Sequence, residues 1–293
     1  MTLPLERAEG NARKARKHVA YPGIAGKVAI VTGAAGGIGK ALVAGFVKEG
    51  LRVAALDIDE KGVRALQAKH GEAKVLGLRI DVSDPEDCRR QVATVAERLG
   101  TVHILVNNAA LGMNSVADDY DDEHLQIEDV PDDLWRRFFA VNVGGAFSMT
   151  RAVVPIFRKQ KWGRVINVST SILTMMRKGF VPYGPTKAAL EAWSLILSRQ
   201  LEGSGITVNV VLPGGPVDTI MVPGEDRSAL ISPNVISPPM LALFTEAGDK
   251  VTGQRFIAVE WDESLGSDPA TQAHAPAAWP QLAKPFSKMQ PRP

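Results

Sequence analysis

The chain has 293 residues, enough for one large domain or two small ones with a substantial buried core. Its 45% hydrophobic and 23% charged content is typical of a globular protein, and 34 basic residues nearly balance 32 acidic ones. That balance creates no overall field for nucleic acid or an anionic membrane surface, so we expect neither partner.

Cysteine content and hydropathy narrow the expected cellular location of the protein. The single cysteine, Cys88, excludes an internal disulfide framework and is typical of a reducing compartment, so we expect a cytoplasmic location. No run of about 18 apolar residues is present, and we therefore expect no membrane-spanning helix. Residues 1–26 carry several basic side chains without the apolar region of a secretory signal. We interpret them as an N-terminal extension, either loosely ordered or in contact with a second subunit.

A glycine-rich segment follows the first predicted strand. Val28 to Val31 is an apolar β-branched run typical of a buried strand, and a helix is predicted from Lys40. Glycines between them permit a tight turn and the close approach of a ligand. The helix N-terminus then offers N–H groups and the positive end of its dipole to a phosphate. The pattern predicts a dinucleotide-binding turn.

The second predicted strand, Val53 to Leu56, ends at Asp57. In a dinucleotide-binding fold, an acid at this point accepts hydrogen bonds from the adenosine ribose hydroxyls. It also repels a 2′-phosphate, so Asp57 favours NAD over NADP. Arg52 precedes the strand and is badly placed to bind such a phosphate.

Strands and helices continue to alternate along residues 27–262. The further strands are expected at 75–80, 102–106, 164–168, 206–212 and 254–259. This alternation predicts an α/β fold: a doubly wound, Rossmann-type parallel sheet of about seven strands in a three-layer α/β/α arrangement. Ligands bind such sheets beyond the carboxyl ends of the strands. Residues 263–293 are rich in proline and are interpreted as an irregular C-terminal extension.

Two polar features interrupt the predicted apolar pattern. An acidic stretch over residues 117–133, with His124, has oxygen ligands for a hard cation. The spacing of its acidic residues matches no known metal-binding loop, so we expect a solvent-exposed loop and no metal site. Asn142 lies within a helix predicted over Leu134 to Lys161, and a buried amide needs partners. It either kinks the helix and orders a water or is a satisfied core amide.

Tyr183 and Lys187 lie four residues apart, which places them on one face of a helix. A nearby ammonium favours the phenolate and lowers the pKa of a tyrosine from its ordinary value of roughly 10. The pair is therefore a candidate proton donor and acceptor. Since this five-residue pattern is common by chance, its interpretation depends on the other motifs.

The motifs in this order resemble the classical short-chain dehydrogenase/reductase family over about residues 27–262. Thr32-Gly33-(x)3-Gly37-Ile38-Gly39 is similar to the family's glycine-rich loop. Asn107-Asn108-Ala109-Ala110 resembles its Asn-Asn-Ala-Gly, with alanine replacing the glycine. Asn142, Tyr183 and Lys187 match its catalytic asparagine and its Tyr-x-x-x-Lys, and Pro213-Gly214 matches its turn after the sixth strand.

The resemblance implies a set of cofactor-binding residues. They are Gly33, Gly37, Ile38, Gly39, Asp57, Asp81, Val82, Asn108, Ala109, Tyr183, Lys187, Pro213, Gly214, Val217 and Thr219. Val217 and Thr219 stand where family members contact the nicotinamide carboxamide. The family's catalytic serine usually precedes the tyrosine by 13 positions, where this chain has Thr170. Thr170 is the first choice, and Ser171 is the alternative if the intervening loop is one residue shorter.

The implied function is an NAD(H)-dependent oxidoreductase that interconverts a small-molecule secondary alcohol and a ketone. Tyr183 would act as general acid and base, and Lys187 would lower its pKa and bind the nicotinamide ribose. Thr170 would hold the substrate oxygen, and Asn142 would order a water of a proton relay. Family resemblance also implies a homo-oligomer, either a dimer or a tetramer.

Two alternatives stay open. A non-catalytic dinucleotide-binding regulator could share the scaffold, although such proteins often lack the tyrosine or the lysine. A sugar-nucleotide epimerase or dehydratase usually needs a longer C-terminal substrate domain than this chain provides.

Overall fold

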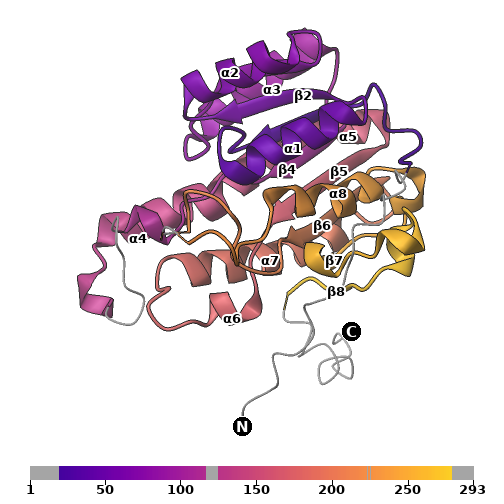
Figure 1. The fold of residues 1–293 in the computed structure, drawn as a ribbon. Helices are drawn as coiled ribbons and strands as arrows, with labels where there is room; N and C mark the ends of the chain where they lie inside the picture. Colours follow the sequence, from indigo (N-terminus) through magenta and orange to yellow (C-terminus); the bar gives the residue numbers. More distant parts are fainter. Residues whose placement is uncertain (1–19, 117–124, 223, 225, 279–293) are drawn as a thin grey trace, which may run out of the picture.

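The computed structural model describes residues 20–116, 125–222, 224 and 226–278. Most of the predicted N-terminal extension, the acidic residues 117–124 with His124, and the chain after Ala278 lie outside the described residues. The described part forms a central sheet with helices on both faces (Figure 1).

The sheet has eight strands in the order β3-β2-β1-β4-β5-β6-β7-β8. The strands β1 to β7 pair in parallel, and β8 is antiparallel to β7. Their bounds are β1 (Val28–Thr32), β2 (Arg52–Asp57), β3 (Val75–Arg79), β4 (Ile104–Asn107), β5 (Gly163–Val168), β6 (Ile206–Leu212), β7 (Gln254–Ile257) and β8 (Ala275–Pro276). The predicted doubly wound α/β class is confirmed, with one more strand than the predicted number of about seven.

Helices on the two faces bury separate cores. One core packs α1 (Gly37–Lys48), α2 (Glu60–His70) and α8 (Ser237–Leu243) on the sheet. The other packs α3 (Pro85–Leu99), α5 (Ala146–Gln160) and α7 (Tyr183–Gln200). Because helices cover both faces, the central strands are apolar throughout, and every residue of β1 and β6 is buried. Cys88 lies in the second core, where burial raises the pKa of its thiol to about 12.

Shorter elements connect these layers. They are α4 (Asp132–Phe139), α6 (Ile172–Met175) and the 3-10 turns at Met113–Ser115, Ile127–Asp129, Pro233–Ile236, Glu246–Gly248, Ala258–Glu260, Glu263–Leu265 and Pro269–Thr271.

The strand order reverses between β1 and β4. From this point the connections lead to opposite edges of the sheet, and ligands of doubly wound folds bind beyond the carboxyl ends of the strands at such a point. The glycine-rich loop follows β1 and the Asn107-Asn108-Ala109-Ala110 segment follows β4. The fold therefore brings the two motifs to the same edge.

The predicted helix over 134–161 is divided in two. A π-helical turn, Ala140–Gly145, separates α4 from α5, and Asn142 lies within it. The run Asp132–Gln160 is long and apolar enough to cross a membrane by length and composition alone, which we had not expected from the absence of a purely apolar run. Helices that cover a sheet pass the same test, and α5 packs on α3, β4 and β5.

The segment expected to be irregular after residue 262 contributes to the sheet. Its residues Ala275 and Pro276 form β8, which pairs with Arg255 and Gln254 of β7. The pairing has no periodic signal because β8 has two residues and carries a proline, which is tolerated at a sheet edge. Buried Gln272 fixes the approach to β8: its amide accepts from the Asp262 N–H and donates to the Asp262 carbonyl, both at 2.9 Å.

We predict that Gln272→Ala destabilises the fold by about 1–2 kcal/mol, since it leaves backbone polar groups of residue 262 without their partner. The free energy of unfolding in urea measures the loss. The neighbouring exposed Thr271→Ala serves as control, with an expected change below about 0.5 kcal/mol. Equal stabilities for the two variants would contradict the role assigned to Gln272.

Candidate active site

The glycine-rich loop packs too closely for side chains. Gly33 has φ +64°, and a Cβ there would lie 2.8 Å from the Ala109 Cα. A Cβ on Gly39 would overlap the Gly33 carbonyl oxygen, so the third glycine lets α1 lie against the loop. The N-cap of α1 is Gly36, whose lack of a side chain leaves the first-turn N–H groups at Gly37, Ile38 and Gly39 without a side-chain cap. Such an uncapped helix N-terminus suits a phosphate group.

Asp57 is held by the same loop. Its Oδ2 accepts from the Ala35 N–H at 2.9 Å, and its Oδ1 accepts from the Asp59 N–H at 3.0 Å. A carboxylate has about four acceptor positions, so capacity remains for a ligand hydroxyl. Arg52 lies at the opposite end of β2 and donates to the Leu99 carbonyl at 3.1 Å. The expectation that Arg52 is remote from Asp57 is confirmed.

Thr32 joins the loop after β1 to the loop after β4. Its hydroxyl accepts from the N–H groups of Asn108 and Ala109, each at 3.1 Å. The Asn108 amide in turn donates to the carbonyls of Thr32 and Gly33, each at 3.0 Å. We had not assigned Thr32 to the site, although a hydroxyl residue at a strand end before glycines was an available signal.

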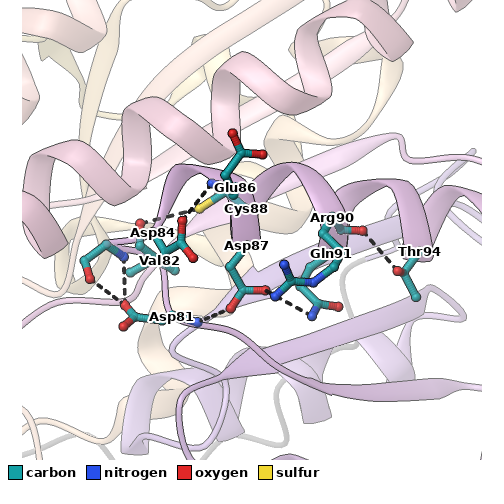
Figure 2. A network of polar contacts seen from close by, with 10 residues as sticks. Asp81, Val82, Asp84, Glu86, Asp87, Cys88, Arg90, Gln91 and Thr94 are labelled. Atoms are coloured by element: carbon teal, nitrogen blue, oxygen red, sulfur yellow. Dashed lines mark hydrogen bonds and ion pairs between the residues drawn. The ribbon is translucent and has the colours of Figure 1, made fainter.

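Asp81 and Val82 lie between β3 and α3 (Figure 2). The Asp81 carboxylate accepts from the N–H and the hydroxyl of Ser83, at 2.9 and 2.6 Å. Asp87 accepts from the Asp81 N–H at 2.9 Å and thereby fixes the turn. The side chain of Val82 is buried and packs so closely on Gly145 that a Cβ there would lie 2.9 Å away. Val82 thus joins the segment before α3 to the π-helical turn, and Asp81 fixes the turn into α3.

The predicted acid–base pair lies at the start of α7. Gly184 permits this placement, because a Cβ there would overlap the Met175 carbonyl of α6. The Lys187 Nζ lies 5.6 Å from the centroid of the Tyr183 ring and donates to the Val168 carbonyl at the end of β5, at 2.9 Å. Burial lowers the pKa of Lys187 to about 8, and the Glu191 carboxylate opposes that shift. The structure thus brings the phenol and the ammonium to the carboxyl edge of the sheet.

Asn142 connects the π-helical turn to both the β4 loop and α7. Its Oδ1 accepts from the Leu111 N–H at 2.7 Å, and its Nδ2 donates to the Leu111 carbonyl at 3.1 Å. The same Nδ2 donates to the Thr186 hydroxyl at 3.0 Å. The amide is therefore satisfied within the protein, and it also lies where the helix departs from α geometry.

The hydroxyl cluster before Tyr183 has three different environments. Ser171 caps α6: its Oγ accepts from the Thr174 N–H at 3.0 Å and bonds the Thr174 hydroxyl at 2.8 Å. Ser169 is buried. Thr170 is partly exposed, and within the described ranges its hydroxyl makes no hydrogen bond. The Ser171 hydroxyl is engaged in capping, whereas that of Thr170 is available.

The loop after β6 closes over the glycine-rich turn. It begins at Pro213 and at Gly214, whose φ of +105° a side chain would strain. Val217 is buried and forms an isolated bridge with Ile231. The Thr219 methyl lies directly over Gly37, leaving no room for a Cβ there. Residues predicted to bind the pyrophosphate and the nicotinamide carboxamide thus lie next to each other.

Arg227 organises this loop and was missed in the sequence. Its Nε donates to Asp218 at 2.9 Å, its Nη1 to the Val222 carbonyl at 2.8 Å, and its Nη2 to the Thr219 carbonyl at 2.7 Å. One guanidinium thereby holds the backbone on both sides of Met221, whose side chain packs on Gly112 of the β4 loop. No local sequence pattern reveals this role, because the five N–H donors of an arginine act on carbonyls that only folding brings together.

We predict that Arg227→Ala loosens the loop after β6. Amide hydrogen exchange at Met221 and Val222 should accelerate by roughly tenfold or more, because the lost hydrogen bonds lower the local opening free energy by about 1–3 kcal/mol. Arg64→Ala, which removes an exposed ion pair with Glu60 on α2, is the control. Unchanged protection in Arg227→Ala would contradict the assignment.

The described residues contain no group of three His, Cys, Asp or Glu side chains that could hold a metal ion. Their site instead combines an uncapped helix N-terminus, the Asp57 carboxylate at the end of β2 and a phenol beside a buried ammonium. Such a combination suits a dinucleotide, and a phenol beside an ammonium can donate and accept a proton.

Comparisons with known proteins agree with this geometry. The family model for short chain dehydrogenases matches residues 27–228. The chain is 32% identical over 189 residues to a Salmonella typhimurium 3-oxoacyl-acyl-carrier-protein reductase, covering 64% of this chain and 73% of that protein. It is 31% identical to the Arabidopsis thaliana NADPH-dependent aldehyde reductase 2, chloroplastic, covering 80% and 93% of the two chains.

Solved structures show the same architecture. A short-chain dehydrogenase/reductase from Burkholderia xenovorans superimposes with a TM-score of 0.67 at 25% identity, covering 80% of this chain and 94% of that one. A Brucella melitensis 3-ketoacyl-acyl-carrier-protein reductase in complex with NADH gives a TM-score of 0.69 at 24% identity, covering 80% and 96%. The chain therefore belongs to the short-chain dehydrogenase/reductase family of nicotinamide-dependent oxidoreductases.

Proposed function

We propose that the protein interconverts a secondary alcohol and a ketone with NAD(H), using Tyr183 as general acid and base. The observation that carries the proposal is the buried Lys187 ammonium, which is anchored on Val168 and lies 5.6 Å from the Tyr183 ring centroid. A desolvated cation beside a phenol stabilises the phenolate, and this brings the pKa of the tyrosine toward the working pH.

The side chains around this pair have distinct roles in the proposal. In oxidation, the Tyr183 phenolate removes the alcohol proton, and in reduction the phenol returns it to the substrate oxygen. The Thr170 hydroxyl donates to that oxygen, which stabilises negative charge as it develops. Asn142 fixes the β4 loop against α7 and is the proposed anchor of a relay water. When bound, the nicotinamide supplies the hydride acceptor or donor.

Three parts of the crevice would hold the dinucleotide. The first turn of α1, at Gly37 to Gly39, receives the pyrophosphate, and Asp57 receives the adenosine ribose. Val82, Asn108 and Ala109 line the crevice further along, next to Asp81. Beyond Pro213 and Gly214, Val217 and Thr219 meet the carboxamide, and Lys187 meets the nicotinamide ribose.

The preference for NAD rests on Asp57. Backbone N–H groups hold its carboxylate at the end of β2, where a 2′-phosphate would meet a fixed negative charge. A second carboxylate, Asp59, follows two residues later. Among the relatives, the Arabidopsis protein is named for NADPH and the Brucella reductase was solved with NADH, so the family uses both.

An apolar substrate suits the mouth of the crevice. Leu173 and Met176 of α6 are 80% and 71% exposed, and Ile220 of the β6 loop is 88% exposed. The Phe180 ring is buried with its centroid 6.3 Å from that of Tyr183, in an edge-on arrangement. We therefore propose a hydrophobic secondary alcohol or ketone as substrate.

We also propose that the protein forms a homo-oligomer packed through α5 and α7. Phe147 of α5 and Ile196 of α7 are 47% and 56% exposed, and Phe147 meets Trp193 of α7 edge-on at 6.2 Å. An apolar face shared by two helices suits burial against a second copy. A cytoplasmic location stays the expectation from cysteine content.

We predict that Tyr183→Phe retains NADH binding while turnover falls by roughly three orders of magnitude or more, because the proton donor and acceptor is removed. Stopped-flow hydride transfer and NADH fluorescence titration measure the two quantities. Tyr21→Phe, at a tyrosine that packs on the α1 core, is the control. A near-wild-type rate in Tyr183→Phe would contradict the role assigned to Tyr183. A wild-type protein that binds NADH but shows no hydride transfer with any alcohol or ketone would instead be a regulator.

We predict further that Asp57→Asn lowers the preference for NAD over NADP by roughly tenfold or more, since it removes the repulsion of a 2′-phosphate but keeps an acceptor for the Ala35 N–H. The ratio of kcat/KM values for the two cofactors reports the change. Asp59→Asn, which retains the cap of α2, should shift the ratio much less. A wild type that strongly prefers NADP would show that Asp57 does not select the cofactor.

A further inference from the structure

A buried ion pair lies one helical turn beyond Lys187. Arg255 of β7 and Glu191 of α7 have side chains 6% and 2% exposed, and the Arg255 Nε donates to the Glu191 Oε1 at 3.0 Å. Two desolvated charges are costly to bury, and an apolar pair of similar volume is often at least as stable. Stability alone therefore does not account for this pair.

Glu191 continues the helix face that carries the acid–base pair. Tyr183, Lys187 and Glu191 recur at every fourth position of α7, so each is a neighbour of the next. Desolvation lowers the pKa of Lys187 to about 8, and the Glu191 charge raises it against that effect. The fraction of Lys187 that is charged near neutral pH thus depends on Glu191.

Arg255 reaches from this carboxylate to the residue with the available hydroxyl. Its Nη2 donates to the Thr170 carbonyl at 3.0 Å, while its Nε holds Glu191. Because the guanidinium is planar and rigid, it fixes the Thr170 backbone and the Glu191 carboxylate relative to each other. Arg255 therefore supports both sides of the proposed reaction centre: the Thr170 hydroxyl through its backbone carbonyl, and the Lys187 ammonium through Glu191.

Other charges around α7 are remote or exposed. The residues of β6, α6 and the π-helical turn that pack on α7 include no titratable side chain. Arg164 of β5 lies at the opposite end of its strand from Val168 and pairs with Asp249. The charged residues of α4 are all exposed: Asp132, Asp133, Arg136 and Arg137. Glu191 and Arg255 are thus the buried charges nearest the acid–base pair among the described residues.

We propose that Glu191 and Arg255 are positioning residues for hydride transfer: Glu191 keeps Lys187 charged, and Arg255 orients Glu191 and Thr170. This inference rests on the function proposed for Tyr183, Lys187 and Thr170. Both residues act through these neighbours.

The test is the pH dependence of alcohol oxidation in Glu191→Gln. Glutamine keeps an acceptor for Arg255 but has no charge, so Lys187 loses its proton more readily and stabilises the Tyr183 phenolate less. The midpoint of the rise of kcat/KM with pH should move up by about one pH unit, while the NADH dissociation constant stays within about twofold. A lower melting temperature with an unmoved midpoint would mean a purely structural role and would overturn the proposal.

Two further variants extend the test to Arg255 and to the whole ion pair. Arg255→Lys keeps the charge but cannot fork between Glu191 and Thr170, so kcat should fall roughly tenfold with little change in the pH midpoint. If Glu191→Gln does not fold, the double variant Glu191→Leu/Arg255→Met replaces the pair by apolar side chains and should move the midpoint in the same upward direction. An unmoved midpoint in that variant would equally overturn the proposal.

The control is Asp249→Asn, which breaks the other ion pair of a buried arginine, at the far end of β5, and should leave the midpoint in place. Full turnover by Tyr183→Phe would mean that the proposed function itself is wrong. An inactive Tyr183→Phe together with wild-type pH profiles in the Glu191 variants would overturn only the role of the ion pair.

Discussion

The burial of one ammonium group constrains the architecture of the site. Lys187 is 3% exposed, and a charge removed from water must find partners or lose its proton. The Val168 carbonyl at the end of β5 accepts from its Nζ, and Glu191 lies one helical turn away. For these contacts to exist, α7 must begin at Tyr183 and lie across the carboxyl end of β5, which in turn needs the closely packed Gly184.

Parallel strands make this arrangement possible over long sequence distances. Because β1 and β4 end at the same edge, Thr32 can bond residues 76 and 77 positions further along the chain. Asn142 then joins the β4 loop to Thr186, and Arg255 joins β7 to Thr170. The proposed cofactor site and the proposed acid–base pair are therefore joined by hydrogen bonds between these elements.

Much of the fold and the core of the candidate site could be predicted from local patterns. The apolar runs of β1 and β6, the glycines before α1 and the four-residue spacing of Tyr183 and Lys187 each have a direct physical meaning in one segment. The π-helical turn at Asn142 and the pairing of β8 had no such signal, since both depend on packing against distant elements. Glu191 and Arg255 were missed for the same reason, since their contacts join residues 64 and 85 positions apart in sequence. Arg227 was missed although it bonds carbonyls five and eight residues before it, because no residue pattern shows how that loop folds back on its guanidinium.

The sequence by itself determined the α/β class and predicted the dinucleotide turn and the acid–base pair, because periodicity, glycine placement and helical spacing act over a few residues. It left the catalytic hydroxyl open between Thr170 and Ser171, which are adjacent and chemically similar. Only the tertiary structure separates their environments: Ser171 caps α6, while Arg255 holds the Thr170 backbone with its hydroxyl uncommitted among the described residues. A hydroxyl's availability depends on its neighbours in space, and those are decided when α6, α7 and β7 pack together.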